Sequence, residues 1–271
     1  MNVLIASDLD RTLIYSAAAL KLDMPDAEAP RLLCVETYGH KPLSYMTETA
    51  ARLLERLQEQ CVFVPTTTRT REQYKRVHLP GGPARYAVCA NGGHILCDGE
   101  SDPDWQAQVR RELEGCAPLR QVCEHLRRAA GDGEWALKQR VADDLFAYLV
   151  VDRARLPLTW VKELAEWAGS CGWTVSLQGR KIYAVPGPLT KSAAVAEIAR
   201  RTGAARTCAA GDSLLDADLL LGAGRGWMPG HGELVDSGWS APHVEVLTER
   251  GVAAGERITR EMLAATEPAA G

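Results

Sequence analysis

Short polar segments follow three apolar stretches of this sequence and carry the residues most able to do chemistry. They are Asp8 with Asp10, the run from Thr66 to Arg69, and Asp212 with Asp216. Clustered carboxylates repel one another unless a cation neutralises them, and oxygen ligands without His or Cys suit Mg²⁺ rather than Zn²⁺. Mg²⁺ held by few carboxylates usually shares its ligand shell with water and phosphate oxygens. The residue types therefore predict a magnesium site that binds a phosphoryl group.

Asp8 and Asp10 alone are also compatible with the solvated end of a strand. Two residues apart in an extended chain, their side chains point the same way. A phosphate additionally needs hydroxyl and N–H donors, which the threonine run and a helix start after Asp8 could supply. Lys191, at the predicted start of a helix after "GPLT", could add a positive charge.

Each polar segment is predicted to lie at the carboxyl end of a β-strand. Residues 2–7 form a short apolar run, and "CVFVP" and "RTCAA" precede the other two segments. An amphipathic helix is predicted over residues 46–60, capped by Thr47 or Ser44. Alternating strands and helices indicate a parallel sheet. Ligands bind beyond the carboxyl ends of such strands, so the polar segments should converge at one edge.

The middle of the chain has a different pattern, in which charged helical stretches are followed by strand candidates. We therefore predict an α/β fold: a doubly wound, Rossmann-like parallel sheet core with an inserted α/β cap domain. The core comprises residues 1–94 and 184–271, and the cap residues 95–183. Residues 17–46 are long for a βα loop, which usually has about 2–6 residues. They are interpreted as a surface excursion or as a flap over the strand ends.

Four motifs occur in order along the chain and resemble those of the haloacid-dehalogenase superfamily of phosphatases. They are "DLDRTL", "TTTR", Lys191 and "GDSLLD". The segment "VCANGGHI" is similar to the Asn-Gly segment that precedes a large, C2-type cap in Cof-like, sucrose-phosphatase-like and mannosyl-3-phosphoglycerate-phosphatase-like members. The resemblance implies Mg²⁺-dependent hydrolysis of a small phosphomonoester, such as a sugar phosphate or nucleotide, through an aspartyl-phosphate.

The resemblance also implies a role for each charged residue. Asp8 is expected to be the nucleophile and Asp10 the general acid and base. Lys191 would hold Asp8 and offset charge on the transferring group. Mg²⁺ would be held by Asp8, the main-chain carbonyl of Asp10 and Asp212, with Asp216 binding it directly or through a neighbour.

Residues that would bind phosphate and substrate are also implied. Thr67 best matches the phosphate-binding hydroxyl, because one residue and then Arg69 follow it. Thr66 is the alternative, and Thr68 belongs to the same segment. Arg69 is equally open to contacting substrate or pairing with a nearby acid. Further substrate contacts are expected from the hinge and cap: Asn91, Gly92, Lys138, Gln178 and Arg180.

Three residues depart from the family pattern: Arg11 in the first motif, and Ser213 and Leu215 near the fourth, where neither change removes an oxygen ligand. Arg11 stands where the family usually has glycine. We interpret Arg11 as adopting an ordinary helical conformation, with its side chain directed to solvent or substrate. His231 and the other histidines are interpreted as surface or core residues rather than ligands.

Composition narrows the function classes. With 271 residues, 46% of them hydrophobic, the chain can form one large domain or two modest ones. A net charge of -4 and sparse aromatics argue against a nucleic-acid partner. No apolar run reaches the roughly 20 residues needed to cross a membrane. The start "MNVLIASDLD" lacks the basic region of a signal peptide, and the eight cysteines form no C-x-x-C pair, so a cytoplasmic protein with reduced thiols is expected.

Alternatives remain open at this level. The same motifs also serve phosphoryl transfer to another acceptor, as in a phosphomutase of the superfamily. A non-catalytic binding or regulatory protein could retain the fold. The expected partner is a small phosphorylated metabolite, and neither its identity nor the oligomeric state follows from the sequence.

Overall fold

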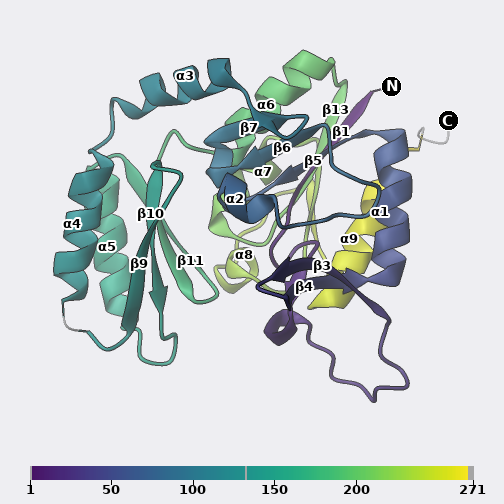
Figure 1. The fold of residues 1–271 in the computed structure, drawn as a ribbon, viewed down its shortest axis with the longest axis horizontal. Coiled ribbons are helices and arrows are strands. Elements are labelled where there is room, and N and C mark those ends of the chain that lie inside the picture. Colours follow the sequence, from purple (N-terminus) through teal and green to yellow (C-terminus); the bar gives the residue numbers. More distant parts are fainter. Residues whose placement is uncertain (1, 132, 268–271) are drawn as a thin grey trace. The chain divides into compact units, whose positions relative to one another are not determined.

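The computed structural model describes residues 2–131 and 133–267 and divides into two compact units (Figure 1). The core unit comprises Met1–Asp102 and Lys191–Gly271, and the inserted unit comprises Pro103–Thr190. The boundaries predicted from sequence, after residues 94 and 183, differ because they lie within strands β7 (His94–Cys97) and β12 (Lys181–Pro186). Each of these strands stays whole with the sheet to which it is hydrogen-bonded.

The core unit is built on an eight-stranded sheet in the order β15-β14-β13-β1-β5-β6-β7-β8. Besides β7, its strands are β1 (Val3–Asp8), β5 (Val62–Thr66), β6 (Tyr86–Cys89), β8 (Glu100–Ser101), β13 (Arg206–Ala210), β14 (Arg225–Met228) and β15 (Val244–Val246). The strands from β15 to β6 pair in parallel, whereas β7 and β8 add an antiparallel edge. The predicted fold class is confirmed, with this antiparallel edge as an addition.

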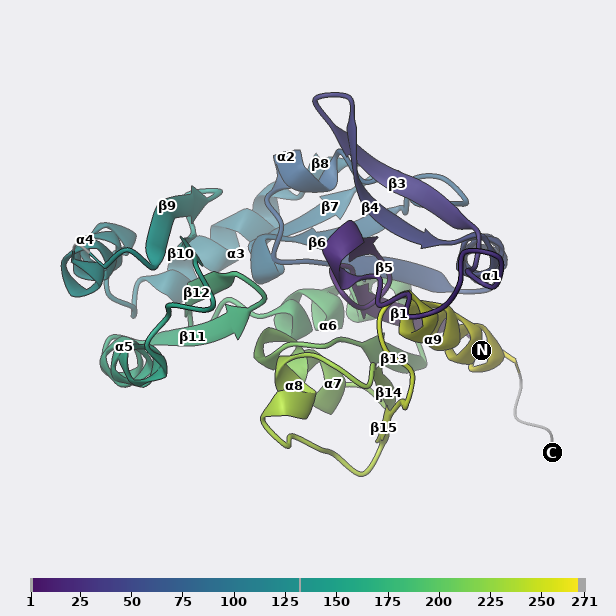
Figure 2. The ribbon, with the colours of Figure 1, turned by 90° about the horizontal axis from the view of Figure 1, so that it is seen from below.

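Helices cover both faces of the core sheet, as Figure 2 shows. On one face lie α1 (Glu48–Gln60) and α9 (Val252–Ala264), and on the other α6 (Lys191–Thr202) and α7 (Ala217–Leu221). Leu54, Leu57 and Met262 are fully buried in one hydrophobic cluster that also contains Ile5 of β1. Every residue of β1 is buried because both faces of the strand are covered. Two further short helices are α2 (Arg71–Tyr74) and α8 (Glu233–Asp236).

Residues 17–46 form most of a small three-stranded sheet in the order β2-β4-β3. Its strands are β2 (Tyr15–Ser16), β3 (Leu32–Tyr38) and β4 (Lys41–Thr47), with a short 3₁₀ helix at Ala17–Ala19. Gly39 and His40 connect β3 to β4 with φ values of 54° and 60°. Positive φ at both central residues is what a type I′ hairpin turn requires. The excursion is therefore an ordered β-hairpin, hereafter the β3–β4 hairpin.

The inserted unit has its own four-stranded antiparallel sheet in the order β11-β12-β10-β9. Besides β12, its strands are β9 (Ala136–Ala142), β10 (Phe146–Val151) and β11 (Trp173–Gln178), and its helices are α3 (Pro103–Leu113), α4 (Leu119–Ala130) and α5 (Leu158–Ser170). Alternate residues of β10, including Ala147, Leu149 and Val151, are buried. Helices α4 and α5 bury Leu126 and Leu164 in the same unit.

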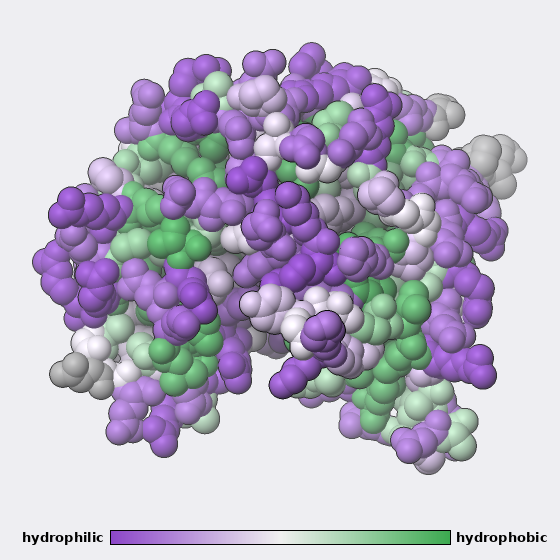
Figure 3. Space-filling model, in the orientation of Figure 1, coloured by the Kyte–Doolittle hydropathy of each residue, from purple (hydrophilic) through white to green (hydrophobic). Residues whose placement is uncertain are grey.

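The surface is mostly polar on the face drawn in Figure 3, with apolar residues gathered in separate patches. The segment between β2 and α1 exposes the large apolar side chains of Met24, Leu33, Tyr38 and Leu43. Among the residues that the structure describes, every helix is too short or too polar to span a bilayer.

Candidate active site

The predicted polar segments meet at the carboxyl edge of the core sheet. Asp8 ends β1, Thr66 ends β5, and Asp212 follows the end of β13. Because β1 pairs in parallel with both β13 and β5, the carboxyl ends of the three strands are neighbours. This is the edge at which ligands bind in open α/β sheets.

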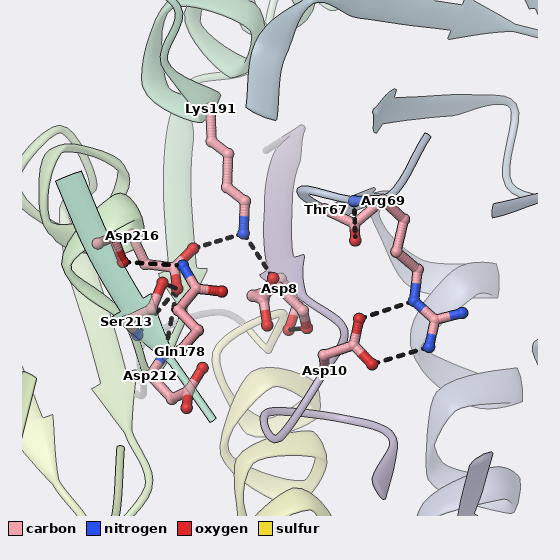
Figure 4. Close-up of polar contacts among 11 residues, drawn as sticks. Asp8, Asp10, Thr67, Arg69, Gln178, Lys191, Asp212, Ser213 and Asp216 are labelled. Atoms are coloured by element: carbon pink, nitrogen blue, oxygen red, sulfur yellow. Dashed lines mark hydrogen bonds and ion pairs between the residues drawn. The ribbon is translucent and has the colours of Figure 1, made fainter. Parts of the chain in front are cut away.

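Three buried carboxylates form the centre of this site (Figure 4). Asp8, Asp212 and Asp216 each offer an oxygen, and these oxygens lie within 4.8 Å of one another. Burial raises the pKa of Asp8 to about 7, with Asp216 and Asp10 adding to the rise and Lys191 opposing it. Burial and the neighbouring Asp8 and Asp216 also raise the pKa of Asp212 well above its usual value.

The donor set fits a hard divalent cation. All the ligand atoms in this cluster are carboxylate oxygens, which Mg²⁺ prefers. Asp8 and Asp212 are buried and their carboxylates lie close together, and both conditions raise their pKa values. A cation among them would relieve both the repulsion and the loss of solvation.

Lys191 holds the nucleophile candidate from the first turn of α6. Its Nζ lies 2.5 Å from Oδ1 of Asp8 and 2.6 Å from Oδ1 of Asp216, and the residue is 1% exposed. Burial alone would lower the pKa of Lys191, but Asp216 and Asp8 raise it above its usual value. The ammonium group therefore stays charged beside Asp8.

Asp216 is bound on both carboxylate oxygens by the protein itself. Besides the contact of Oδ1 with Lys191, Oδ2 accepts hydrogen bonds from the main-chain N–H groups of Asp212 and Ser213 and from the Ser213 hydroxyl. A Cβ added to Gly211 would lie 2.4 Å from Cβ of Asp216, so only glycine permits this approach. These bonds favour a role for Asp216 in holding Lys191 and the loop over direct metal coordination.

The conformation predicted for Arg11 is wrong. Its φ is 68°, in the left-handed region, because the chain turns back here and the Arg11 N–H donates to the carbonyl of Ile14 at 2.8 Å. A glycine would adopt this φ without the strain of about 1–2 kcal/mol that a side chain brings. The side chain lies beside Asp212, with Nε 3.3 Å from Oδ2.

His231 supports the same turn as a buried residue, which agrees with its interpretation as a core residue rather than a ligand. Its Nδ1 accepts the N–H of Gly251 at 3.3 Å, so the proton is on Nε2, which donates to the carbonyl of Arg11 at 3.0 Å. Burial lowers the pKa of His231 to about 4, which keeps the ring neutral. The signal in the sequence is the pair of flanking glycines in "PGHGE": a Cβ on Gly232 would lie 2.5 Å from the Asp212 carbonyl oxygen.

The threonine run places two hydroxyls near the end of β5. Thr66 Oγ1 is buried and has no hydrogen-bond partner among the described residues. Thr67 Oγ1 accepts the N–H of Arg69 at 3.1 Å, which leaves its own proton to be donated. Thr68 is also buried. Both Thr66 and Thr67 thus remain candidates for binding a phosphoryl oxygen.

Arg69 pairs with an acid, the second of its two predicted roles. Its Nε lies 2.7 Å from Oδ2 of Asp10 and its Nη2 lies 2.8 Å from Oδ1, a bidentate contact. Figure 4 shows the Asp10 side chain directed toward Arg69, whereas Asp8 faces Lys191. The side chain of Asp10 is half-exposed.

The remaining predicted residues fall in two places. Asn91 and Gly92 are buried beside the threonine run: the Asn91 N–H donates to the Thr67 carbonyl at 3.0 Å. Lys138 lies on β9 and Arg180 in the turn between β11 and β12, and both are exposed side chains of the inserted unit. Gln178, the last residue of β11, is partly buried. Their predicted contact with substrate stays a prediction.

The fold is similar to that of several solved phosphatase structures. A sucrose-phosphatase from Synechocystis, in complex with sucrose and phosphate, matches with a TM-score of 0.64 and 19% identity over 97% of this chain and 98% of that chain. The C-terminal domain of trehalose-6-phosphate phosphatase from C. albicans matches with a TM-score of 0.54 and 13% identity over 98% and 91% of the two chains.

A phosphatase of the haloalkanoate (HAD) superfamily from Bacteroides thetaiotaomicron matches with a TM-score of 0.54 and 15% identity over 97% and 95% of the two chains. No family model and no curated protein sequence matches this chain. The chain thus has the fold of haloacid-dehalogenase-superfamily phosphatases, as the motifs predict.

Proposed function

We propose that this protein is a Mg²⁺-dependent phosphatase that hydrolyses a small phosphomonoester through an aspartyl-phosphate on Asp8. The observation that carries the proposal is the buried cluster at the carboxyl edge of the core sheet. There Asp8 contacts the ammonium group of Lys191, and a carboxylate oxygen of Asp8 lies within 4.8 Å of one of Asp212. A nucleophilic carboxylate, a fixed positive charge and cation ligands are the parts that phosphoryl transfer requires.

The reaction proceeds in two balanced steps. An oxygen of Asp8 attacks phosphorus, and the bond from phosphorus to the leaving oxygen breaks while Asp10 gives that oxygen its proton. Water then attacks the phosphorus of the aspartyl-phosphate and loses a proton to Asp10, which releases phosphate and restores the carboxylate of Asp8. Lys191 holds Asp8 in place and offsets charge on the transferring group.

Mg²⁺ would be held by Asp8, the main-chain carbonyl of Asp10 and Asp212. When bound, it supplies positive charge that neutralises the carboxylates and the phosphoryl oxygens. Arg11 and Asp216 would affect the charge at this site, because Arg11 lies beside Asp212 and Asp216 holds Lys191.

The substrate is proposed to be a phosphorylated metabolite. The hydroxyl of Thr67 or Thr66 would donate a hydrogen bond to an oxygen of its phosphoryl group. Asn91, Gly92, Lys138 and Arg180 are the proposed specificity residues. Two of the similar structures are named for sugar-phosphate substrates or their sugars. Sugar phosphates are therefore the first compounds to screen, followed by nucleotides and phosphoglycerate derivatives.

The test is hydrolysis of p-nitrophenyl phosphate with and without Mg²⁺. Wild type is expected to release nitrophenol only with the metal, and Asp8→Asn to lose more than about 10³-fold in kcat. Asp218→Asn, a change to an exposed acid on α7, is the matched control and should retain activity. Equal inactivity of wild type and Asp8→Asn would favour a non-catalytic binding protein instead.

Product analysis separates hydrolysis from transfer. A phosphatase releases free phosphate from a sugar phosphate, whereas a phosphomutase returns an isomerised sugar phosphate. We expect free phosphate in stoichiometric amounts with the sugar.

A further inference from the structure

Glu36 is a buried carboxylate for which the proposed mechanism has no role. It lies on β3 of the hairpin and is 2% exposed. Its Oε2 is 2.9 Å from Nη1 of Arg69, and its Oε1 is 3.3 Å from Nη2 of Arg76. The hydroxyl of Ser44, on β4, donates to Oε2 at 2.6 Å. A carboxylate removed from water is tolerated only with such partners, so its presence here calls for a reason.

Arg69 connects Glu36 to Asp10. One guanidinium group binds Asp10 through Nε and Nη2 and faces Glu36 through Nη1. The group is planar and rigid, so its nitrogens move together and a contact at Nη1 restricts where Nε and Nη2 can lie. The side chain of Arg69 is only 11% exposed, which leaves it little room to turn. Glu36 therefore limits the orientations in which Arg69 can grip Asp10.

The strand that carries Glu36 is itself anchored to the core unit. Glu36 forms an isolated antiparallel bridge with Val77, and the His78 N–H donates to the carbonyl of Val35 at 2.8 Å. Both partners lie just after α2, in the segment that follows Arg69 along the chain. The hairpin thus presents Glu36 from a fixed position rather than from a free loop.

We propose that Glu36 is a positioning residue for Asp10. By holding the guanidinium group of Arg69, it fixes the carboxyl group of Asp10 in the orientation from which a proton passes to the leaving oxygen. This inference rests on the proposed function, because the orientation of Asp10 matters only if Asp8 takes the phosphoryl group. The β3–β4 hairpin, which carries Glu36, would then have a positioning role in the reaction.

The leaving group of the substrate provides a readout specific to proton transfer. p-Nitrophenolate is a stabilised anion that departs without a proton, whereas phenolate is more basic and gains more from protonation. The kinetic constant kcat/KM covers the chain of steps up to departure of the leaving group. A displaced Asp10 must therefore lower kcat/KM more for phenyl phosphate than for p-nitrophenyl phosphate.

The experiment compares these two esters in Glu36→Gln, which keeps the shape of the side chain and removes its charge. The ratio of kcat/KM for p-nitrophenyl phosphate to that for phenyl phosphate is expected to rise about tenfold over wild type. Asp10→Asn serves as the reference with the largest ratio. The matched control is Glu197→Gln, because Glu197 is also paired with two arginines, Arg200 and Arg201, and should leave the ratio unchanged.

An equal loss for both esters, or no loss, would overturn the inference, because a purely structural role affects both alike. A crystal structure of Glu36→Gln with the bidentate contact between Arg69 and Asp10 intact would overturn it too. If Glu36→Gln does not fold, Ser44→Ala decides. It removes the 2.6 Å hydrogen bond to Glu36 and a longer, 3.4 Å contact with Nη2 of Arg69, and it should raise the ratio by about twofold to threefold. Wild type inactive on both esters refutes the proposed function, whereas active wild type with unchanged ratios refutes this inference alone.

Discussion

Positive and negative groups surround Asp8, and its pKa depends on the balance between them. Burial raises its pKa to about 7 although the Lys191 ammonium group is 2.5 Å away. A nucleophile must be ionised, and without metal only part of Asp8 is ionised near neutral pH. A divalent cation would complete it by favouring the charged form.

The pKa of Asp8 predicts how stability depends on pH without metal. Its pKa in the folded state, about 7, exceeds the ordinary value of 3.8, so the folded state binds more protons between these values. The contribution of Asp8 to the free energy of unfolding is thus full below about pH 4 and is lost as pH rises through 7. Urea unfolding in EDTA should show Asp8→Asn gaining stability relative to wild type between pH 5 and pH 8, by no more than about 4 kcal/mol. A difference that is constant with pH would contradict this.

Arg11 is expected to compete with a metal ion for Asp212. Its Nε lies 3.3 Å from Asp212, and its φ of 68° suits glycine. We expect Arg11→Gly to bind Mg²⁺ about fivefold more tightly in calorimetric titration, since roughly 1 kcal/mol of competing interaction is removed. Stability should change little, because relief of the strained φ offsets the lost ion pair. Arg11→Lys, which keeps the positive charge, is the control. Weaker binding of Mg²⁺ by Arg11→Gly than by wild type would refute the competition.

At the scale of elements, Thr47 joins two helices that cover the same face of the core sheet. Its Oγ1 caps α1 by accepting the N–H of Ala50 at 3.0 Å and donates to Oε2 of Glu256 on α9 at 2.7 Å. Thr47→Ala should lower the free energy of unfolding by about 1–2 kcal/mol, because it removes both bonds. Thr47→Ser keeps the hydroxyl and should recover most of the loss. Urea unfolding with no difference between the two variants would contradict the assignment.

The elements that hold the site follow from the sequence because their signals are local. The strands that end at Asp8 and Thr66 are short apolar runs followed by polar residues, and these runs predict buried parallel strands. Alternation of strands with helices then places the strand ends at one edge. The meeting of Asp8, Lys191 and Asp212 follows from that edge and from the motif resemblance.

The β3–β4 hairpin and the Arg11 turn could not be predicted in the same way. The hairpin is held by Glu36 contacts to Arg69 and Arg76, which lie more than one strand further along the chain. Its turn, Gly39-His40, is a weak signal compared with Asn-Gly. The left-handed φ of Arg11 is set by hydrogen bonds to Ile14 and His231, and the arginine itself gives no indication of it.

The core unit has a mostly parallel main sheet and the inserted unit an antiparallel one, and the buried acidic cluster belongs to the core unit. The described residues contain one buried acidic cluster able to hold a metal, Asp8 with Asp212 and Asp216. Because these carboxylates are distributed between distant parts of the chain, a cation that binds them stabilises the folded core unit as a whole.

Mg²⁺ should therefore raise the melting temperature of the full chain. Binding only to the folded state adds about 2.7 kcal/mol at a metal concentration 100 times the dissociation constant. Scanning calorimetry with Mg²⁺ and with EDTA should show this shift in wild type and a much smaller one in Asp212→Asn. The same shift in both proteins would place the metal elsewhere.

Asp8 is expected to become phosphorylated during turnover, and trapping that intermediate is the most direct test of the proposed mechanism. Wild type mixed with Mg²⁺ and p-nitrophenyl phosphate is quenched in acid during the steady state, and its peptides are analysed by mass spectrometry. One phosphoryl group on Asp8, absent from Asp8→Asn and from unreacted protein, is the predicted result. Active turnover with an unmodified Asp8, or with hydrolysis retained in Asp8→Asn, would contradict the account.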